Sequence, residues 1–350
     1  MVNLRSLDRS GLEVFVAAQT GAGSDAALRI FKEVWQQGVT RIGAMTRVRR
    51  SIRDKLAAGA EIRPLTLAQR QDSADGSTKF LWRLHDGHTI ESVLIPDADR
   101  VTLCISSQVG CAMGCTFCLT GDMGLLRHLT VDEIAAQPLQ VQQLAPEHRI
   151  SNLVLMGMGE PLHNLKALVP ALRICLDDHA LNFSHRRVTV STVGLVPKMA
   201  ALAAALPVNL AVSLNATTEA QRRQIMPITA RHSMQALLDE CRAFPLPSGK
   251  RITFEYVMFA GFNDAIEDAQ RLIGLLDGIP SKVNLIPYNE NPDRPNMRRP
   301  SAAVVKVFQH HLVSRGVSCS VRVTRGLDIS AACGQLGRVI SPAQEAGWTP

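Results

Sequence analysis

The sequence predicts an α/β fold in which an open or complete (β/α) barrel follows a small helical N-terminal domain. From about residue 100 onward, short β-rich segments alternate with segments of helical periodicity. The β-rich segments are almost continuously apolar, which is typical of strands in a parallel sheet covered by helices. The first seventy or so residues show only helical spacing of their apolar side chains. In a barrel of this kind, active-site residues lie at the carboxyl ends of the strands.

The N-terminal region, residues 1–74, is predicted to be helical. Apolar residues recur at helical spacing in three segments, Leu7–Ala18, Ala26–Gln37 and Arg47–Ala58. The first strand pattern comes at Phe80–Leu84, and a turn leads from it to a second one at Glu91–Ile95. We therefore expect residues 75–99 to form a β-hairpin that bridges to the main body.

The main body, residues 100–340, is predicted to contain seven strands and six helices, with residues 341–350 as a C-terminal tail. The strands are expected at Val101–Ser106, Asn152–Met156, Arg187–Ser191, Asn209–Ser213, Arg251–Met258, Lys282–Ile286 and Ser318–Val323. The helices are expected at Thr130–Gln143, Leu165–Asp178, Met199–Leu206, Ser233–Phe244, Ala265–Leu276 and Ser301–Arg315. Thr130 followed by Glu133 predicts a capping box at the start of the first helix.

Charge and composition narrow the class of protein. The net charge of +7 and the pI near 9.2 favour polyanionic partners. Four arginine-rich clusters favour RNA or DNA, although each alone is typical of a solvated surface; they are residues 47–55, Arg186-Arg187, Arg222-Arg223 and residues 294–299. No secretory or membrane-spanning segment is expected, so we expect a cytoplasmic protein with no membrane partner. Eight cysteines in such a chain favour metal or redox chemistry over disulfides.

Three cysteines after the first strand of the main body form the most informative motif. Cys111, Cys115 and Cys118 have the spacing C-x-x-x-C-x-x-C, which places three thiolates on one short loop. Three soft sulfur ligands suit a 4Fe-4S cluster whose fourth iron is left for a small molecule. A structural zinc site would need four protein ligands, and the sequence holds no second C-x-x-C. Incidental core cysteines are the remaining alternative.

Glycine and polar residues follow the later strands. Gly157–Pro161 follows the second strand, where glycine lets backbone approach a ligand and Glu160 could pair with an ammonium group. Ser191 ends the third strand, Ser213-Leu214-Asn215 follow the fourth, and Asn289 follows the sixth. Such residues also end strands for local reasons, but their recurrence at successive strand ends indicates a polar cofactor site.

The sequence resembles the radical S-adenosylmethionine superfamily and, within it, the RlmN/Cfr family of RNA adenine methyltransferases. The resemblance to the superfamily rests on the cysteine motif, the segment Gly157–Pro161 and the alternation of strand and helix patterns. The segments Thr102–Cys111, Thr324–Gly326 and Ala331–Leu336 narrow it to the family. The resemblance covers roughly residues 75–340 and, more loosely, the N-terminal helices. It implies a radical S-adenosylmethionine (β/α) partial barrel with an RNA-binding accessory domain at the N-terminus.

The resemblance also implies cofactors and their ligands. Cys111, Cys115 and Cys118 would hold the 4Fe-4S cluster, and S-adenosylmethionine would bind its remaining iron. Seven residues would cradle that cofactor: Gly159, Glu160, Ser191, Ser213, Leu214, Asn215 and Asn289. An electron donor such as flavodoxin would reduce the cluster, and the protein is expected to be a monomer.

The catalytic roles implied by the resemblance fall on three further residues. Cys333 would carry a methyl group from a first S-adenosylmethionine, and a second one would supply the radical that activates it. Cys104 would release the methylated RNA by forming a transient disulfide with Cys333, and Glu91 would accept a proton. A radical route is needed because a ring carbon of adenine is electrophilic and does not take a methyl group from a sulfonium.

Several features depart from the family or point to its two branches. Asn215 stands where the family usually has histidine, and the loop at residues 290–300 is rich in arginine. Thr120–Leu125 resembles the Cfr branch, which methylates carbon 8 of adenine, whereas Pro161 resembles the RlmN branch, which methylates carbon 2. Methylation of carbon 2 of an adenine in 23S ribosomal RNA, and possibly in tRNA, is the main hypothesis, and carbon 8 is the alternative.

Two functions of other classes remain as alternatives. One is a radical enzyme acting on a different RNA, a protein or a small molecule, which would not need the pair Cys104 and Cys333. The other is a zinc-stabilised RNA-binding module without activity. Cys175, Cys241 and Cys319 lie in helix or strand patterns without a motif and are predicted to be core residues.

Overall fold

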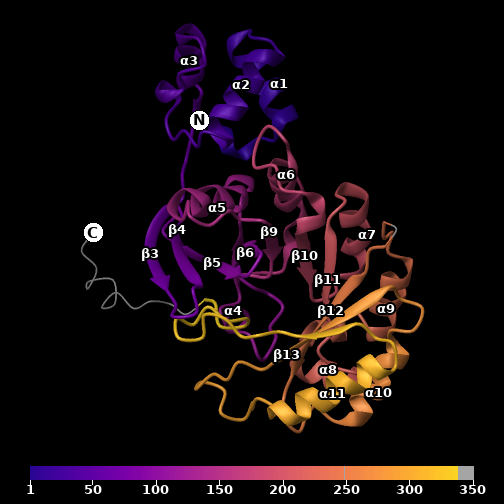
Figure 1. Ribbon diagram of the computed structural model, residues 1–350. Coiled ribbons are helices and arrows are strands. Elements are labelled where there is room, and N and C mark those ends of the chain that lie inside the picture. The colour runs from indigo at the N-terminus through magenta and orange to yellow at the C-terminus, as the bar shows by residue number, and fades with distance from the viewer. Residues whose placement is uncertain (248, 338–350) are drawn as a thin grey trace.

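The structure is a computed structural model that describes residues 1–247 and 249–337. The predicted tail, residues 341–350, and residues 338–340 of the main body lie outside the described residues. A sheet of ten strands runs through the main body (Figure 1). From one edge to the other its strands are β14 (Cys319–Val321), β13 (Ser281–Pro287), β12 (Ile252–Met258), β11 (Asn209–Ser213), β10 (Val188–Thr192), β9 (Asn152–Leu155), β6 (Arg100–Cys104), β5 (Thr89–Asp97), β4 (Thr78–Arg83) and β3 (Thr66–Asp72).

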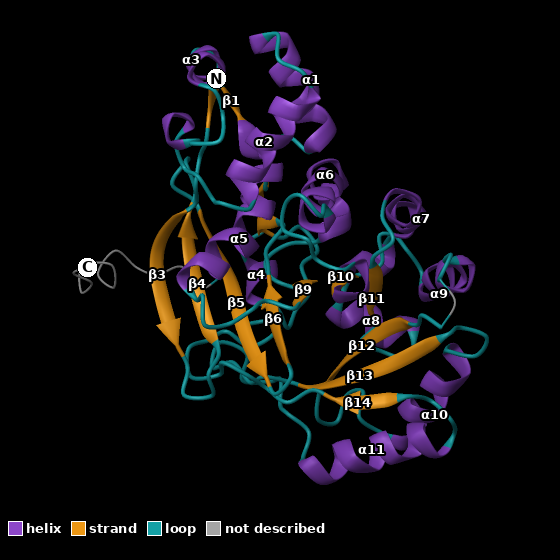
Figure 2. Cartoon of the chain, turned by 45° about the horizontal axis from the view of Figure 1, so that its top comes forward, coloured by secondary structure: helices purple, strands orange, loops and turns teal. Residues whose placement is uncertain are grey.

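The sheet has a parallel part and an antiparallel part. The strands β6 and β9 to β14 run parallel to one another. The strands β3, β4 and β5 extend the sheet beyond β6 in antiparallel order. Within the described residues, β14 and β3 each pair on one side only, so the barrel remains open (Figure 2). The predicted α/β partial barrel is thus confirmed.

Helices cover the parallel part, which explains why its strands are apolar on the outside. All six predicted helices are present: α5 (Val131–Leu144), α6 (Leu165–Leu176), α7 (Val196–Ala205), α9 (Met234–Ala243), α10 (Ile266–Leu275) and α11 (Ala302–Ser314). The predicted capping box is confirmed, because the Thr130 backbone N–H donates to the Glu133 carboxylate at 3.0 Å. No helix within residues 1–247 and 249–337 has the length and apolar character that a membrane crossing requires.

The N-terminal helices pack together above α5 and α6 (Figure 1). They are α1 (Arg9–Thr20), α2 (Ser24–Trp35) and α3 (Arg50–Ala57). The short strands β1 (Val2–Asn3), before them, and β2 (Ala60–Glu61), after them, pair in parallel. Asn3 and Ser6 donate hydrogen bonds to Asp132 at the start of α5, at 2.8 and 2.7 Å. These bonds attach the N-terminal helices to the first helix of the barrel.

The expectation that no strand precedes Phe80 is wrong. β3 (Thr66–Asp72) lies within the region predicted to be helical, and it pairs with β4 at the edge of the sheet. Its sequence Thr-Leu-Ala-Gln-Arg-Gln-Asp lacks apolar alternation, because no residue of this edge strand is buried. A strand without a buried face leaves little pattern in the sequence.

Candidate active site

A cavity opens at the carboxyl ends of the parallel strands, where barrels of this kind place their active sites. Nine of the residues singled out from the sequence line it: Cys111, Cys115, Cys118, Gly159, Glu160, Ser191, Ser213, Asn215 and Cys333. The other four, Glu91, Cys104, Leu214 and Asn289, do not line it. The parallel strands therefore bring together residues that are more than 200 positions apart in the sequence.

The cysteine loop, residues 111–124, is closed at its base by backbone pairing. It connects β7 (Gln108–Gly110) to β8 (Leu125–His128), which pair antiparallel. The Cys111 backbone N–H donates to the Gly124 carbonyl at 2.8 Å. Gly110 has a φ of 74°, and a Cβ at this position would overlap the Gly124 oxygen, so the loop base requires glycine.

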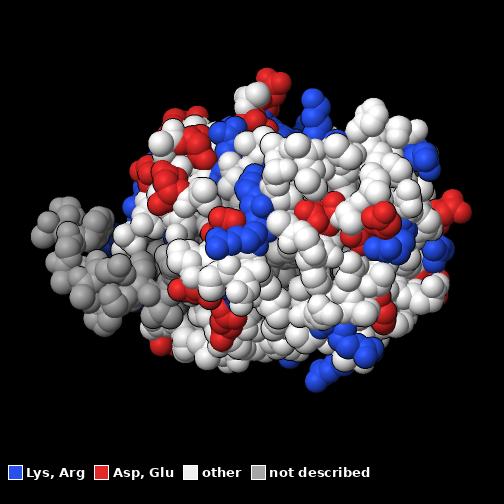
Figure 3. All heavy atoms as spheres, turned by 90° about the horizontal axis from the view of Figure 1, so that it is seen from below, with Lys and Arg blue, Asp and Glu red and all other residues white. Residues whose placement is uncertain are grey.

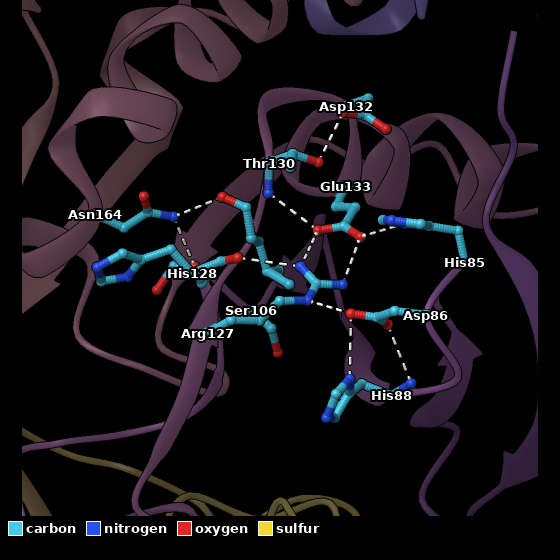
Figure 4. Close-up of polar contacts among 12 residues, drawn as sticks. His85, Asp86, His88, Ser106, Arg127, His128, Thr130, Asp132, Glu133 and Asn164 are labelled. Carbon is cyan, nitrogen blue, oxygen red and sulfur yellow. Dashed lines mark hydrogen bonds and ion pairs between the residues drawn. The ribbon is translucent and has the colours of Figure 1, made fainter.

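Arg127 braces the base of the cysteine loop from outside (Figure 4). Its guanidinium donates to the two carboxylate oxygens of Glu133 at 2.7 and 2.8 Å and to Asp86 at 2.5 Å. The bond from Arg127 holds the pKa of Asp86 well below its usual range. Because Asp86 lies in the turn between β4 and β5, one side chain ties that turn to β8 and α5.

The environment of the three thiols fits metal-bound sulfur. Burial raises the pKa of Cys111 to about 12, and burial raises the pKa of Cys115 further, with the charges of the neighbouring thiolates adding to the effect. Free thiolates are therefore disfavoured, and bound iron would supply the positive charge that lets each sulfur lose its proton. These three soft donors beside an open cavity fit a 4Fe-4S cluster.

The spacing of the thiols also argues against a single-ion site. Among residues 1–247 and 249–337, no three or more Cys, His, Asp or Glu side chains are placed to hold one metal ion. Each thiolate of a four-iron cluster binds a different iron, so its sulfurs do not converge on one point.

Gly159 and Glu160 form a polar part of the cavity wall. Burial raises the pKa of Glu160 to about 7, although the Val193 and Leu162 backbone N–H groups donate to its carboxylate at 2.9 and 3.0 Å. A buried carboxylate of this kind gains from a ligand that donates hydrogen bonds to it, such as an amino group. Gln108 fixes the segment, because its side-chain oxygen accepts from the Glu160 N–H at 2.7 Å.

The end of β11 and the segment after it line the cavity with Ser213 and Asn215, and Asn215 also bonds to a neighbouring strand. Asn215 has a φ of 59°, a left-handed conformation that asparagine tolerates well. Its side-chain oxygen accepts from the Val257 N–H at 2.9 Å. Asparagine at this position is thus explained by backbone geometry and by a bond to β12. Leu214 is fully buried, and its N–H donates to the Glu255 carbonyl at 3.0 Å.

Arg222, on α8 (Glu219–Ile225), holds this strand end from behind. It is 1 % exposed, and its guanidinium donates to the carbonyls of Val193, Ser213 and Leu214 at 2.5, 3.1 and 3.1 Å. Burial lowers its pKa to about 10. The expectation that Arg222 belongs to a surface cluster is therefore wrong, because its charge is used to fix the carbonyl groups at two strand ends.

The Cys333 loop, residues 322–337, follows β14 and lies against the cysteine loop. The Leu119 N–H donates to the Gly334 carbonyl at 2.9 Å, and the Thr120 hydroxyl donates to the Leu336 carbonyl at 2.8 Å. Asn289 donates to the Cys333 carbonyl at 3.2 Å, so it contacts this loop and not the cavity. These bonds place Cys333 in the same cavity wall as the three clustered cysteines.

Four side chains of the antiparallel part also hold the Cys333 loop. Asp75 accepts from the Gly326 N–H at 2.7 Å, and Ser73 donates to Asp328 at 2.6 Å. Lys79 donates to the Ser330 carbonyl at 3.4 Å and forms a buried ion pair with Glu91 at 3.1 Å. Glu91 in turn accepts from the Gly337 N–H at 2.6 Å. Lys79 belongs to no motif, so its role could not be predicted from the sequence.

Cys104 ends β6 beneath the Cys333 loop. It is buried, and burial raises its pKa to about 12, with the nearby Cys333 adding to the rise and Arg322 opposing it. Both cysteines are free thiols. The charges of the nearby Cys333, Glu255 and Cys104 raise the pKa of Arg322. This cation, at the end of a short edge strand, was also missed by sequence reasoning.

Comparisons with known proteins identify the family. Residues 105–273 match the model of the radical S-adenosylmethionine superfamily, and residues 2–62 match that of the ribosomal RNA large subunit methyltransferase N-terminal domain. A dual-specificity RNA methyltransferase RlmN of Anaeromyxobacter sp. (strain Fw109-5) is 50% identical over 95% of this chain and 90% of its own. The RlmN of Geotalea uraniireducens is 50% identical over 96% of each chain. The chain belongs to the RlmN/Cfr family.

A solved structure agrees with this assignment. A radical S-adenosylmethionine methyltransferase from Sphaerobacter thermophilus matches with a TM-score of 0.90 and 41% identity, over 96% of this chain and 99% of the other. As a member of the RlmN/Cfr family, the chain is an S-adenosylmethionine-dependent RNA methyltransferase of the radical type. It uses a 4Fe-4S cluster and S-adenosylmethionine.

The arginine clusters of this RlmN/Cfr protein differ in how far they are exposed and in what they contact. Arg47, Arg49 and Arg50 are exposed near the start of α3. Arg294, in contrast, is only 12 % exposed and donates to the Cys118 carbonyl at 3.2 Å and to Asp122 at 2.6 Å. On the face seen in Figure 3, the basic and acidic side chains of the described residues are interspersed and form no large basic patch. Arg294 therefore belongs to the surroundings of the cysteine loop.

Proposed function

We propose that this enzyme methylates carbon 2 of an adenine in 23S ribosomal RNA, and of an adenine in tRNA, through a methylated Cys333. One observation carries the proposal: Cys333 lies in the wall of the cysteine-lined cavity, close enough to Cys104 for its charge to raise the pKa of the Cys104 thiol. A radical enzyme that acts directly on its substrate needs no such pair. The names of the relatives, which describe dual-specificity RNA methyltransferases, support RNA as the substrate.

When bound, the cluster and two molecules of S-adenosylmethionine per turnover would supply the methyl group and the radical that activates it. The residues of the chain carry the methyl group, release the methylated RNA and accept a proton. Cys333 carries the methyl carbon and then the RNA. Cys104 attacks the Cys333 sulfur, so the bond from that sulfur to the RNA-bound carbon breaks, that carbon takes up a proton to become the methyl group, and a Cys104–Cys333 disulfide forms. Two electrons from an external reductant restore both thiols.

The surroundings of the cysteine pair support these roles. Burial keeps Cys104 protonated, and Arg322 provides the nearby positive charge that favours its thiolate when it attacks. We assign proton acceptance to Glu91, whose carboxylate is oriented by Lys79 at 3.1 Å and by the Gly337 N–H at 2.6 Å. Glu91 reaches the Cys333 loop from β5, because its carboxylate accepts from the Gly337 N–H.

Carbon 2 is proposed over carbon 8 because Pro161 follows Gly159-Glu160 as in the RlmN branch, and because the relatives carry that branch's name. Thr120–Leu125, which resembles the Cfr branch, favours carbon 8 as the second candidate. We further propose that the enzyme acts as a monomer in the cytoplasm and that a flavodoxin-like protein supplies its electrons.

Mass spectrometry of ribosomal RNA and tRNA from a strain lacking this gene tests the substrate. We expect loss of one methylated adenine in 23S ribosomal RNA and one in tRNA, and the chromatographic identity of the lost nucleoside distinguishes carbon 2 from carbon 8. Unchanged methylation in both RNA classes would contradict the proposal.

Two variants test the covalent route. Cys104→Ala should accumulate a protein–RNA adduct, seen as a nuclease-sensitive shift on a denaturing gel, because no thiol remains to break the bond to RNA. Cys333→Ala should form no adduct and transfer no methyl group. Cys175→Ala, a buried cysteine of α6, serves as the control and should behave like the wild type. Turnover by Cys333→Ala would overturn the carrier mechanism.

A further inference from the structure

A second chamber lies inside the open barrel, at the other end of the same strands. The active-site cavity is lined by the carboxyl-terminal residues of the parallel strands, and this chamber is lined by their amino-terminal residues, among them Thr102, Asn152, Thr189, Thr253 and Ser320. Side chains two positions apart on a strand share one face. Thr189 and Ser191 on β10, like Thr253 and Val257 on β12, therefore face one continuous interior.

Three residues line both spaces and form the waist between them: Met156, Glu255 and Arg322. Cys104 belongs to the same interior face, because it comes two positions after Thr102 on β6. Arg322 is close enough to both Cys104 and Cys333 to respond to their charges. Neither cysteine lines the chamber itself, but through Arg322 the chamber adjoins the active-site cavity whose wall holds Cys333.

The lining of this chamber is unusual for a barrel interior, which branched apolar side chains normally fill. Hydroxyl and amide side chains line it together with apolar residues, and four cations, Arg100, Lys282, Arg322 and Arg325, outnumber two carboxylates, Asp97 and Glu255. Asp97 pairs with Arg100 at 2.9 Å and with Arg325 at 3.8 Å. Lys282 is exposed and, within the described residues, makes no hydrogen bond or ion pair.

We infer that this chamber, named here the lumen chamber, binds the phosphates and sugars of the RNA substrate and admits the target adenine toward Cys104 and Cys333. Cationic, hydroxyl and amide side chains are the groups that bind nucleic-acid backbones. At the opposite, carboxyl end of the strands, the Cys333 loop is bonded to the cysteine loop through Leu119 and Thr120, and both loops form part of the wall of the active-site cavity. The inference rests on the proposed function and adds the route and the residues by which RNA enters.

A charge-removing double variant tests the lumen chamber. Lys282→Gln with Arg100→Gln should weaken binding of an RNA stem-loop that contains the target adenine about tenfold, the effect expected for removal of a charge-assisted hydrogen bond. The slope of log affinity against log salt should become shallower by roughly 0.7–0.9 for each phosphate that the variant no longer neutralises. Lys306→Gln with Arg315→Gln, two exposed positions at α11 and its end, is the matched control and should change neither.

A second variant tests passage through the lumen chamber. Ser320→Phe places a bulky side chain at an exposed position of edge strand β14 that lines the chamber. RNA methylation should be lost, whereas iron content and methylation of Cys333, read from the intact protein mass, should remain at wild-type levels. Val313→Phe on α11, also exposed, is the control.

The outcomes separate this inference from the proposed function. If the wild type methylates RNA while the double variant and Ser320→Phe bind and methylate it like their controls, the lumen chamber is not the RNA route. If the wild type methylates no RNA, the proposed function fails and the inference fails with it. Weaker binding and a shallower salt slope in the double variant alone, together with blocked methylation in Ser320→Phe, support the inference.

Discussion

The parallel and the antiparallel parts of the sheet serve the active site in different ways. The parallel strands β9 to β13 deliver side chains directly, because their carboxyl ends meet at one edge, and the loops that follow β6 and β14 add further residues to the cavity. The antiparallel strands β3 to β5, all within the described part of the chain, contribute no residue to the cavity lining. Side chains of this part instead hold the Cys333 loop: Asp75, Lys79 and Glu91 bond to its backbone, and Ser73 bonds to the Asp328 side chain.

This difference shows that supplying reactive groups and positioning them are separate tasks in this enzyme. Residues of the parallel part can be recognised by their chemistry, since thiols and carboxylates line a cavity. Residues of the antiparallel part act at a distance, and their replacement should alter the placement of Cys333 while leaving the cluster site intact.

The largest expected effect lies in the parallel part. Simultaneous replacement of Cys111, Cys115 and Cys118 by alanine should abolish iron binding and S-adenosylmethionine cleavage, because the cluster loses all of its protein ligands. Anaerobic reconstitution should give about four irons per wild-type chain and a brown protein. Full iron loading of the triple variant would refute the assignment of the cluster site.

A smaller effect is expected in the antiparallel part. Lys79→Met leaves the buried Glu91 carboxylate without its partner, so the free energy of unfolding should fall by about 3 kcal/mol. Chemical denaturation measures this change, and Arg242→Met, which breaks an exposed pair with Asp239, should cost less than about 1 kcal/mol. Iron content of Lys79→Met should match the wild type while RNA methylation drops. If Lys79→Met lost iron as well as methylation, the proposed difference between the two parts would be contradicted.

The smallest effect concerns the junction of the two parts, where Cys104 ends β6. Because burial raises the pKa of Cys104 to about 12, its thiol stays protonated at neutral pH and becomes reactive only as the pH rises toward that value. Alkylation of the folded protein by iodoacetamide, followed by peptide mass spectrometry, should label Cys104 very slowly at pH 7 and steadily faster up to pH 10. Rapid labelling at pH 7 would show that the thiol is already ionised.

The strands, helices and site residues of the parallel part could be predicted from the sequence for physical reasons. Its strands are short apolar segments separated by amphipathic helices, so both periods are visible along the chain. The cluster ligands lie within eight positions of one another, so their spacing is a local signal. Glu160, Ser191 and Ser213 could be found because the ends of parallel strands share one edge.

The antiparallel part was harder to predict because its role depends on contacts between distant segments. Lys79 meets Ser330 across 251 positions, and Asp75 meets Gly326 across the same separation. Arg222 looked like half of a surface pair, and only the structure shows it buried against strand-end carbonyls. Cys104 and Cys333 were paired through the family resemblance, since nothing local links two cysteines so far apart.

The closed base of the cysteine loop bears on how the enzyme matures in the cell. The loop is held by the β7–β8 pairing, the bond from Cys111 to Gly124 and the brace from Arg127, none of which requires iron. Small zinc domains differ, because they collapse only when metal draws their ligands together. We therefore expect the loop base to form before iron is bound, so that a shortage of iron would leave folded, inactive protein that can still receive its cluster.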